Sequence, residues 1–439
     1  MDSATMSLLM IGFLIVGIAT GLPIAWVLGG VAVGSTLLFV DANFLFALVK
    51  TTLGMMNNWV LVAVPLFILM AMVLDKSEII ADLFETAYKW SGGLRGGLAA
   101  GAVIVGTIFA ACTGITAAAI VTLGLIALPI MLKHNYQKDI ALGSILAGGT
   151  LGQLIPPSVM ILLYGSVTQV SIGAMFAGGI ASGVILSAMY VVYILTRSLI
   201  NPSLCPALAL EERVSWSEKF AAMKMLVLPI LLITAVLGSI FSGAATPTEA
   251  SAVGAFGAFV CAAVRRKLNW QVVKGSCINT LKLCGMVAWI VLAGIYFSTV
   301  FNAIGGAQLV RAALVMMPGG TMGALAVMLL VLFLLGMLVD VSAVVIIAGP
   351  IFGPIAAQLG FDPVWFGVLF MVLLQMGYIS PPFGMSLFYL DSVAPRPTIT
   401  MADIYRSSWA FLGIQVIALV LFIVFPQTIL WLPNLFFGA

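Results

Sequence analysis

Long apolar segments, separated by short polar connections, follow one another along almost the whole chain. A helix needs about 20 apolar residues to cross the hydrocarbon core of a bilayer. The apolar stretches are continuous and do not alternate with polar residues, which excludes a transmembrane β-barrel. We therefore predict an all-α polytopic membrane protein. The apolar segments are residues 6–20, 24–40, 59–74, 97–111, 115–132, 139–163, 173–196, 225–241, 247–264, 284–301, 322–338, 342–357, 364–392 and 409–426.

Two stretches, 97–132 and 322–357, each consist of two short apolar segments that meet at small polar residues. Each stretch is either two full spans or a re-entrant hairpin that enters and leaves the membrane on one side. The hairpin interpretation, with the N-terminus outside, places every Lys and Arg except Lys50 and Arg311 in the cytoplasm. This distribution follows the positive-inside rule. The first hairpin then opens to the cytoplasm and the second to the outside.

Composition narrows the functional classes. Hydrophobic residues make up 63% of the 439 residues and charged residues only 8%, against roughly 25% charged in soluble domains. A cytosolic enzyme, a nucleic-acid binder and a disordered chain are excluded on this basis. The motifs GxxxxGK[ST] and HExxH are absent, and His134 is the single histidine. We therefore expect no enzymatic chemistry and a process driven by an ion gradient.

The chain is predicted to contain an internal repeat. A shift of 225 positions aligns Pro156 and Pro157 with Pro381 and Pro382. The same shift pairs Pro129 with Pro354, Gly152 with Gly377, and Tyr164 with Tyr389. Because the charge-based topology gives the halves opposite orientations, we expect inverted repeats, which are typical of secondary transporters. The predicted divisions are a first repeat (1–198), a cytoplasmic linker (199–224), a second repeat (225–426) and a C-terminal tail (427–439). Segment 75–95 has the pattern of an amphipathic interfacial helix.

Two adjacent prolines interrupt one long apolar segment in each half. They occur in GQLIPPS within 139–163 and in GYISPPF within 364–392. Two missing N–H donors must break a helix, and carbonyls freed inside a membrane need a partner. Sodium is a suitable partner, because hard cations bind oxygen ligands. The alternative is a simple proline kink, but two breaks at matching positions favour a function.

The hairpin tips carry further oxygen ligands. The first tip offers Thr113, Gly114 and Thr116, and the second offers Asp340 and Ser342. The alternative role is helix capping, in which Thr113 or Asp340 satisfies free N–H groups. An intramembrane carboxylate is a functional candidate by default, so Asp340 is predicted to serve ion coupling or gating.

The segment ATPTEA predicts a helix start instead of a site. Thr246 as N-cap and Glu249 three positions later form a capping box, with a proline at the first helical position. Glu249 could in addition contact an ion or proton pathway.

The whole set of motifs resembles the large membrane subunit of tripartite ATP-independent periplasmic (TRAP) transporters. The resemblance covers nearly the whole chain. Its most specific parts are GLPIAWVLG, VPLFILMA, the small-residue tip at 111–119, GQLIPPS, TPTEA, the Asp340 segment and GYISPPFG. It implies an elevator-type carrier for sodium-coupled uptake of an organic acid in a bacterial inner membrane, with a periplasmic N-terminus. Hairpins and broken helices would form the moving domain and the other helices the scaffold.

The resemblance also implies partners and site residues. A periplasmic binding protein would deliver the organic acid, and a small four-helix membrane subunit, expected as a separate chain, would accompany this one. No cofactor other than Na⁺ and no nucleic acid is expected. The first sodium site would comprise Thr113, Gly114, Thr116, Gly152, Pro156, Pro157 and Ser158. The second would comprise Gly336, Asp340, Ser342, Gly377, Pro381 and Pro382. The cargo would lie near Thr113, Ser158, Ser342 and Ser380.

Two other functions stay open at this point. A stand-alone divalent-anion/sodium symporter of the same superfamily would need no binding protein, and an ion channel would conduct without saturation. The identity of the cargo does not follow from the sequence, since selectivity in this family largely resides in the binding protein.

Overall fold

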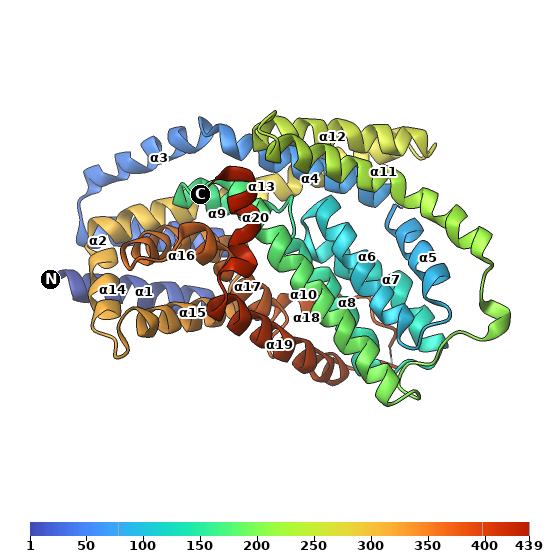
Figure 1. The fold of residues 1–439 in the computed structure, drawn as a ribbon. Coiled ribbons are helices and arrows are strands. Elements are labelled where there is room, and N and C mark those ends of the chain that lie inside the picture. Colours follow the sequence, from blue (N-terminus) through green and yellow to red (C-terminus); the bar gives the residue numbers. More distant parts are fainter. Residues whose placement is uncertain (78, 397, 439) are drawn as a thin grey trace.

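A computed structural model describes residues 1–77, 79–396 and 398–438 (Figure 1), and within these ranges every regular element is helical. The first half contains α1 (Ser3–Ala19), α2 (Ile24–Phe39), α3 (Phe46–Met56), α4 (Ala63–Lys76), α5 (Ile79–Ser91), α6 (Gly97–Thr113), α7 (Thr116–Lys133), α8 (Lys138–Thr150), α9 (Val159–Thr168) and α10 (Ile172–Ile200). The second half contains α11 (Trp216–Phe241), α12 (Pro247–Val264), α13 (Trp270–Ala303), α14 (Gly306–Val315), α15 (Gly320–Leu338), α16 (Val341–Gln358), α17 (Pro363–Tyr378), α18 (Met385–Asp391), α19 (Met401–Val424) and α20 (Gln427–Phe437). Short 3₁₀ turns occupy Ala42–Leu45, Trp59–Val62, Leu151–Gln153 and Leu210–Glu212.

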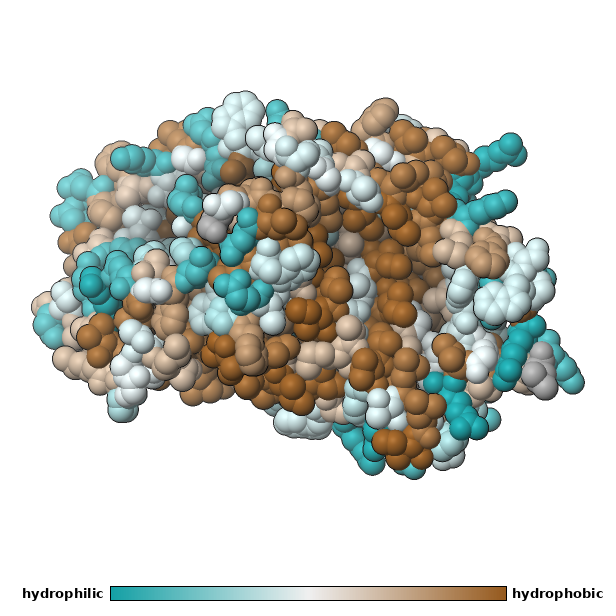
Figure 2. All heavy atoms as spheres, in the orientation of Figure 1, coloured by the Kyte–Doolittle hydropathy of each residue, from teal (hydrophilic) through white to brown (hydrophobic). Residues whose placement is uncertain are grey.

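The prediction of a multi-pass helical membrane protein is confirmed. Within the described ranges, 9 helical stretches are long and apolar enough to cross a membrane. Figure 2 shows a broad hydrophobic area across the middle of the visible face, with hydrophilic residues gathered mainly toward its left and right edges. Lipid tails satisfy no backbone hydrogen bonds, so a helical chain with an apolar exterior is the expected solution.

Both helices that contain a proline pair are interrupted, as predicted. α8 ends at Thr150 and α9 begins at Val159, with Pro156 and Pro157 in the irregular segment between them. In the second half, α17 ends at Tyr378 and α18 begins at Met385. We call segments 151–158 and 379–384 the first break and the second break. Both Pro–Pro peptide bonds are cis.

The predicted hairpin stretches each form two helices that pack on one another, α6 with α7 and α15 with α16. The first tip turns at Gly114, whose φ of +60° suits glycine best. The second tip turns through Val339 and Asp340, both in extended backbone conformations. Because the tips use different turns, their polar side chains are presented differently.

Several elements extend beyond the sequence-based boundaries. α11 begins at Trp216, inside the predicted linker, because Ser215 and Glu218 form a capping box there. Most of the predicted C-terminal tail is helical in α20. α14, which carries Arg311, has no counterpart among the predicted apolar segments, since Gln308 and Arg311 interrupt its apolar run.

The two broken helices lie at the centre of the packing. Every residue of α8 from Ile140 onward and every residue of α17 from Trp365 onward is buried. By contrast, α3 has no buried residue. The first break is buried throughout, so its freed backbone groups lie among protein neighbours, which is the condition under which a membrane tolerates irregular backbone. In the second break Pro382 and Phe383 are exposed.

Candidate functional site

The tip of the first hairpin lies directly against the first break. A methyl group added at Gly114 would lie only 2.3 Å from the carbonyl oxygen of Pro157. One added at Gly152 would lie 3.6 Å from the backbone of Gly114 and Ile115. The absence of a side chain at Gly114 therefore lets the backbones of tip and break approach closely, whereas a methyl group at Gly152 would only make ordinary van der Waals contact. We call this contact region the first junction.

Uncharged oxygen atoms dominate the first junction. In the described part of the chain, Thr116 Oγ1 and Gln153 Oε1 are buried and have no hydrogen-bond partner. Ser158 is fully buried, and its hydroxyl donates to the carbonyl oxygen of Gln153 at 2.8 Å. A buried acceptor left unpaired costs about 1–3 kcal/mol, so unpaired oxygens at one place suggest a ligand.

Of the two residues named in the capping alternative, Thr113 does not cap a helix. Its hydroxyl donates to the carbonyl oxygen of Phe109 at 3.0 Å, within α6. The turn at Gly114 leaves Thr113 in the last turn of α6, where the carbonyl four residues earlier is the nearest acceptor. Ile115 occupies the N-cap of α7 and makes no side-chain cap.

The second hairpin meets the second break in a similar way. A methyl group added at Gly377 would lie 2.5 Å from the carbonyl carbon of Gly336 and 2.7 Å from the nitrogen of Met337. The ends of α15 and α17 therefore pack backbone to backbone. Tyr378, the last residue of α17, donates its hydroxyl to Asp340 Oδ2 at 3.4 Å. We call this region the second junction.

Asp340 caps a helix, as the capping alternative predicted. Its Oδ1 accepts the backbone N–H of Ser342 at 2.9 Å and also the Ser342 hydroxyl. Its other oxygen, Oδ2, receives the long bond from Tyr378 and retains lone pairs that can bind a cation. Capping and cation binding can thus use different oxygens of one carboxylate. The predicted role in ion coupling stays a prediction.

The second junction borders a large cavity of about 950 Å³. Asp340, Met385 and Tyr389 form one wall, and helices α2, α3 and α13 supply the rest. On the far wall, Trp26 and Trp289 stack with ring centroids 6.1 Å apart. The carboxylate therefore lies at the boundary between a hairpin–break unit and the first-half helices α2 and α3.

The capping box at the start of α12 is confirmed. Thr246 Oγ1 accepts the backbone N–H of Glu249, and the Glu249 carboxylate accepts the backbone N–H of Thr246 at 2.8 Å. α12 packs on α4 and α11. A contact of Glu249 with an ion pathway stays a prediction.

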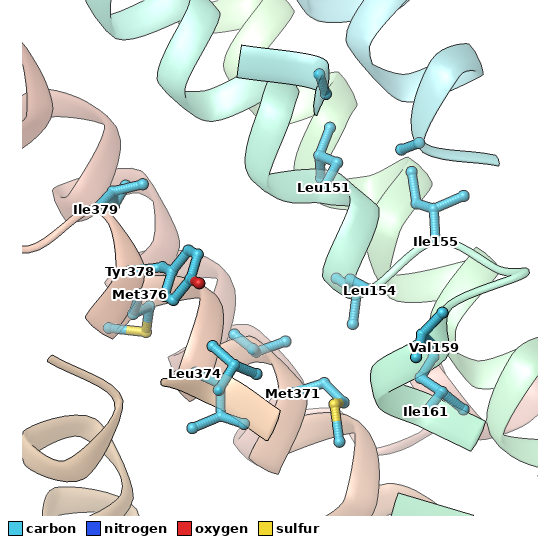
Figure 3. Packing of buried hydrophobic residues seen from close by; sticks show 14 of the residues in the cluster. Leu151, Leu154, Ile155, Val159, Ile161, Met371, Leu374, Met376, Tyr378 and Ile379 are labelled. Carbon is cyan, nitrogen blue, oxygen red and sulfur yellow. The ribbon is translucent and has the colours of Figure 1, made fainter. Parts of the chain in front are cut away.

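Three polar residues near the junctions escaped the sequence analysis. They are Gln153, Gln375 and Tyr378, all buried among apolar neighbours. Figure 3 shows the surroundings, with Leu151 and Leu154 on one side and Leu374 and Met376 on the other. Each is a polar side chain a few positions before a proline pair in an otherwise apolar segment. This position in the sequence could have identified the three residues as site candidates.

The oxygen donors suit an alkali cation better than a transition metal. In the described residues no group of three or more His, Cys, Asp or Glu side chains could hold a metal ion. The first junction offers hydroxyl, amide and main-chain oxygens, and the second adds one carboxylate. Hard cations prefer such ligands, whereas zinc and copper prefer nitrogen and sulfur.

Comparison with known proteins identifies a family. The sequence model of the tripartite ATP-independent periplasmic transporter DctM component matches residues 11–428. The C4-dicarboxylate TRAP transporter large permease protein of Pseudomonas aeruginosa is 32% identical, over 86% of this chain and 87% of its own length. That of Vibrio cholerae is 30% identical, over 100% and 99% respectively. The ectoine TRAP transporter large permease protein of Halomonas elongata is 28% identical over 98% of each chain.

A likeness to solved structures concerns the fold. The Alcanivorax borkumensis YdaH transporter superposes with a TM-score of 0.63 and 17% sequence identity. The match covers 97% of this chain and 99% of that one.

Proposed function

Because the chain belongs to the DctM component family, the large permease subunits of TRAP transporters, we propose that it carries an organic acid across a bacterial inner membrane by sodium coupling. The family consists of transporter permeases and not of enzymes. One observation carries the sodium proposal. In each half, the hairpin packs closely on the broken helix of that same half: tip against break at Gly114–Pro157, and the last turns of α15 and α17 against each other at Gly336–Gly377.

In this proposal each junction binds one Na⁺. Main-chain oxygens of the breaks supply part of each coordination shell, as unwound helices do in other secondary transporters. Thr116 and Gln153 complete the first site, since their oxygens are buried and unpaired in the described chain. Asp340 completes the second site and supplies the negative charge there.

The cargo is proposed to bind beside the cations. An organic acid carries a carboxylate, which bound cations attract. The N-termini of α7 and α9 add favourable partial charge, because their N-cap residues Ile115 and Ser158 make no side-chain cap. Neither the charged cargo nor the bare cations readily enter an apolar path. Because each neutralises the charge of the other, they cross together, and the sodium gradient drives the uptake of the organic acid.

Alternating access is proposed to follow the elevator scheme, with inverted repeats. Hairpins α6–α7 and α15–α16 and the broken helices would move together, because glycine contacts join each hairpin to its break. The cavity beside Asp340 lies where this unit meets α2, α3 and α13, and therefore offers room for the cargo. A small membrane subunit and a periplasmic binding protein complete the proposed transporter.

A sodium titration of the purified protein tests the proposal. Na⁺ at about 100 times its Kd should raise stability by about 2.7 kcal/mol for each occupied site, and K⁺ should not. Pro157→Ala and Pro382→Ala restore an N–H and permit the helix to close, so each should lose much of this thermal stabilisation. Pro229→Ala, inside α11, is the matched control and should keep it. If both break variants keep the wild-type sodium response, the two-site proposal is wrong.

Uptake by the whole transporter gives a second readout. In proteoliposomes with the small subunit and the binding protein, uptake should require an inward sodium gradient. Equal uptake driven by a proton gradient in sodium-free buffer would contradict sodium coupling. Equal uptake without the binding protein would instead favour a stand-alone symporter.

A further inference from the structure

One hydrogen bond joins the two broken helices directly. Gln375 Nε2, in α17, donates to Thr150 Oγ1, in α8, at 3.3 Å. The two residues are 225 positions apart, which is the shift that aligns the proline pairs. Both side chains are completely buried. The bond therefore connects equivalent positions of the two halves inside the core.

The bond continues into the backbone of α8. Thr150 Oγ1 accepts from Gln375 and donates its own proton to the carbonyl oxygen of Ala147 at 3.1 Å. The surroundings are apolar: the buried Leu151 follows Thr150 in the sequence, and the buried Leu374 precedes Gln375 (Figure 3). A hydrogen-bond chain in such low-dielectric surroundings is stronger than it would be in water. The bond is thus a direct polar link between the two broken helices.

Both ends of the bond lie next to a junction. Thr150 is the last residue of α8, and Gly152, two positions later, contacts the first hairpin tip. Gln375 stands two positions before Gly377, which contacts Gly336 at the end of α15. A change in geometry at either junction therefore reaches the Gln375–Thr150 pair through two residues of main chain.

We infer that the Gln375–Thr150 hydrogen bond couples the two proposed sodium sites, so that ion binding at one junction favours ion binding at the other. Gln375 and Thr150 are positioning residues in this scheme and need not touch a cation. The inference depends on the proposed function, because it requires both junctions to bind Na⁺. A coupling of this kind is typically worth about 5- to 150-fold in affinity.

Sodium-binding curves of the purified full-length protein test the coupling. NaCl is titrated against KCl at constant ionic strength, and the saturation curve is fitted for half-saturation and Hill coefficient. The wild type should bind cooperatively. Gln375→Leu and Thr150→Val remove the bond with little change of volume, and each should lower the Hill coefficient toward unity. Half-saturation should rise by about 5-fold or more.

Three further variants separate coupling from general damage. Gln415→Leu removes a buried glutamine from α19, which packs on α8 but takes no part in the Gln375–Thr150 bond, and should leave the Hill coefficient unchanged. Thr150→Ser keeps the hydroxyl and should retain cooperativity, even if Gln375→Leu proves too unstable to purify. The double variant Gln375→Leu/Thr150→Val should be no less cooperative than either single variant, because both remove one bond.

The outcomes distinguish this inference from the proposed function. Wild-type cooperativity in both Thr150→Val and Gln375→Leu would overturn the coupling while leaving sodium binding intact. Non-cooperative sodium binding by the wild type would also overturn the coupling alone. A wild type that shows no response to Na⁺ at all would overturn both.

Discussion

The two junctions have similar backbone contacts but different chemistry. In each, a glycine lets a hairpin pack closely on the broken helix of the same half, at tip and break in the first and between the last turns of α15 and α17 in the second. At the first junction the side-chain oxygens are neutral and buried, at Thr116 and Gln153. At the second, Asp340 brings a carboxylate to the edge of a large cavity. The backbone arrangement thus recurs, while the side chains assign the charge to one half only.

The difference is clearest at aligned positions. The shift of 225 pairs Ile115 with Asp340 and Gln153 with Tyr378. An apolar residue on one side therefore corresponds to an acid on the other, and an amide corresponds to the phenol that contacts this acid. A charge near the membrane centre is costly, by about 2.5–3.5 kcal/mol on insertion scales. A cation at the second junction removes that cost, whereas one at the first junction brings a charge into neutral surroundings.

The largest expected effect is that of Asp340→Asn. The variant keeps a capping side chain, because Asn caps helices about as well as Asp, but removes the charge. We expect sodium affinity to fall on the order of 100-fold, equivalent to about 2.7 kcal/mol, with loss of sodium-driven uptake. Sodium titration and uptake assays measure this. Asp362→Asn, the same change at the exposed N-cap of α17, should have no effect on either assay. A sodium response equal to wild type in Asp340→Asn would show that Asp340 caps α16 and does not bind sodium.

Alanine at the junction glycines should have the next largest effect. Gly114→Ala places a methyl group 2.3 Å from the Pro157 oxygen at a positive φ, and Gly377→Ala places one 2.5 Å from Gly336. Overpacking typically costs about 1–3 kcal/mol, and the positive φ adds to it at Gly114. Thermal unfolding should rank Gly114→Ala below Gly377→Ala. The control is Gly413→Ala in α19, where an added methyl group meets nothing within 4 Å. Equal stability of all three variants would refute close backbone contact at the junctions.

The smallest effect, and the most diagnostic in sign, is expected for Thr116→Val. The change removes a buried hydroxyl oxygen that has no partner in the described chain. In sodium-free buffer the variant should be more stable than wild type by about 1 kcal/mol, because an unpaired polar group is lost. In sodium it should gain less stability than wild type. Thermal unfolding of variant and wild type in sodium-free and in sodium-containing buffer measures both differences in stability. A variant that gains as much from sodium as wild type would exclude Thr116 as a ligand.

The sequence predicted those features that depend on local chemistry. Proline lacks an N–H, so the breaks at Pro157 and Pro382 follow from residue type alone. The capping box at Thr246 and Glu249 follows equally from spacing. The cap formed by Asp340 was foreseen as one of two alternatives. In all these cases the partner groups lie within a few positions along the chain.

Features that depend on packing were missed or wrong. The Gln375–Thr150 bond joins residues that only the folded core brings together. The contact of Tyr378 with Asp340 spans 38 positions and required the second hairpin to reach the end of α17. Capping by Thr113, one of the alternatives left open, does not occur, because the Thr113 hydroxyl donates to the Phe109 carbonyl within its own helix. Sequence spacing cannot settle such orientations.

The short arms of the broken helices have an electrical consequence. α8 has 13 residues and α9 has 10, which correspond to about 20 Å and 15 Å at the rise of an α-helix. Neither arm alone spans a hydrocarbon core of about 30 Å, so a broken helix that crosses the membrane carries its break within the membrane's electric field. An elementary charge that crosses the full potential exchanges about 2.3 kcal/mol per 100 mV. A cation that reaches this break has crossed part of that potential, and its affinity therefore depends on voltage.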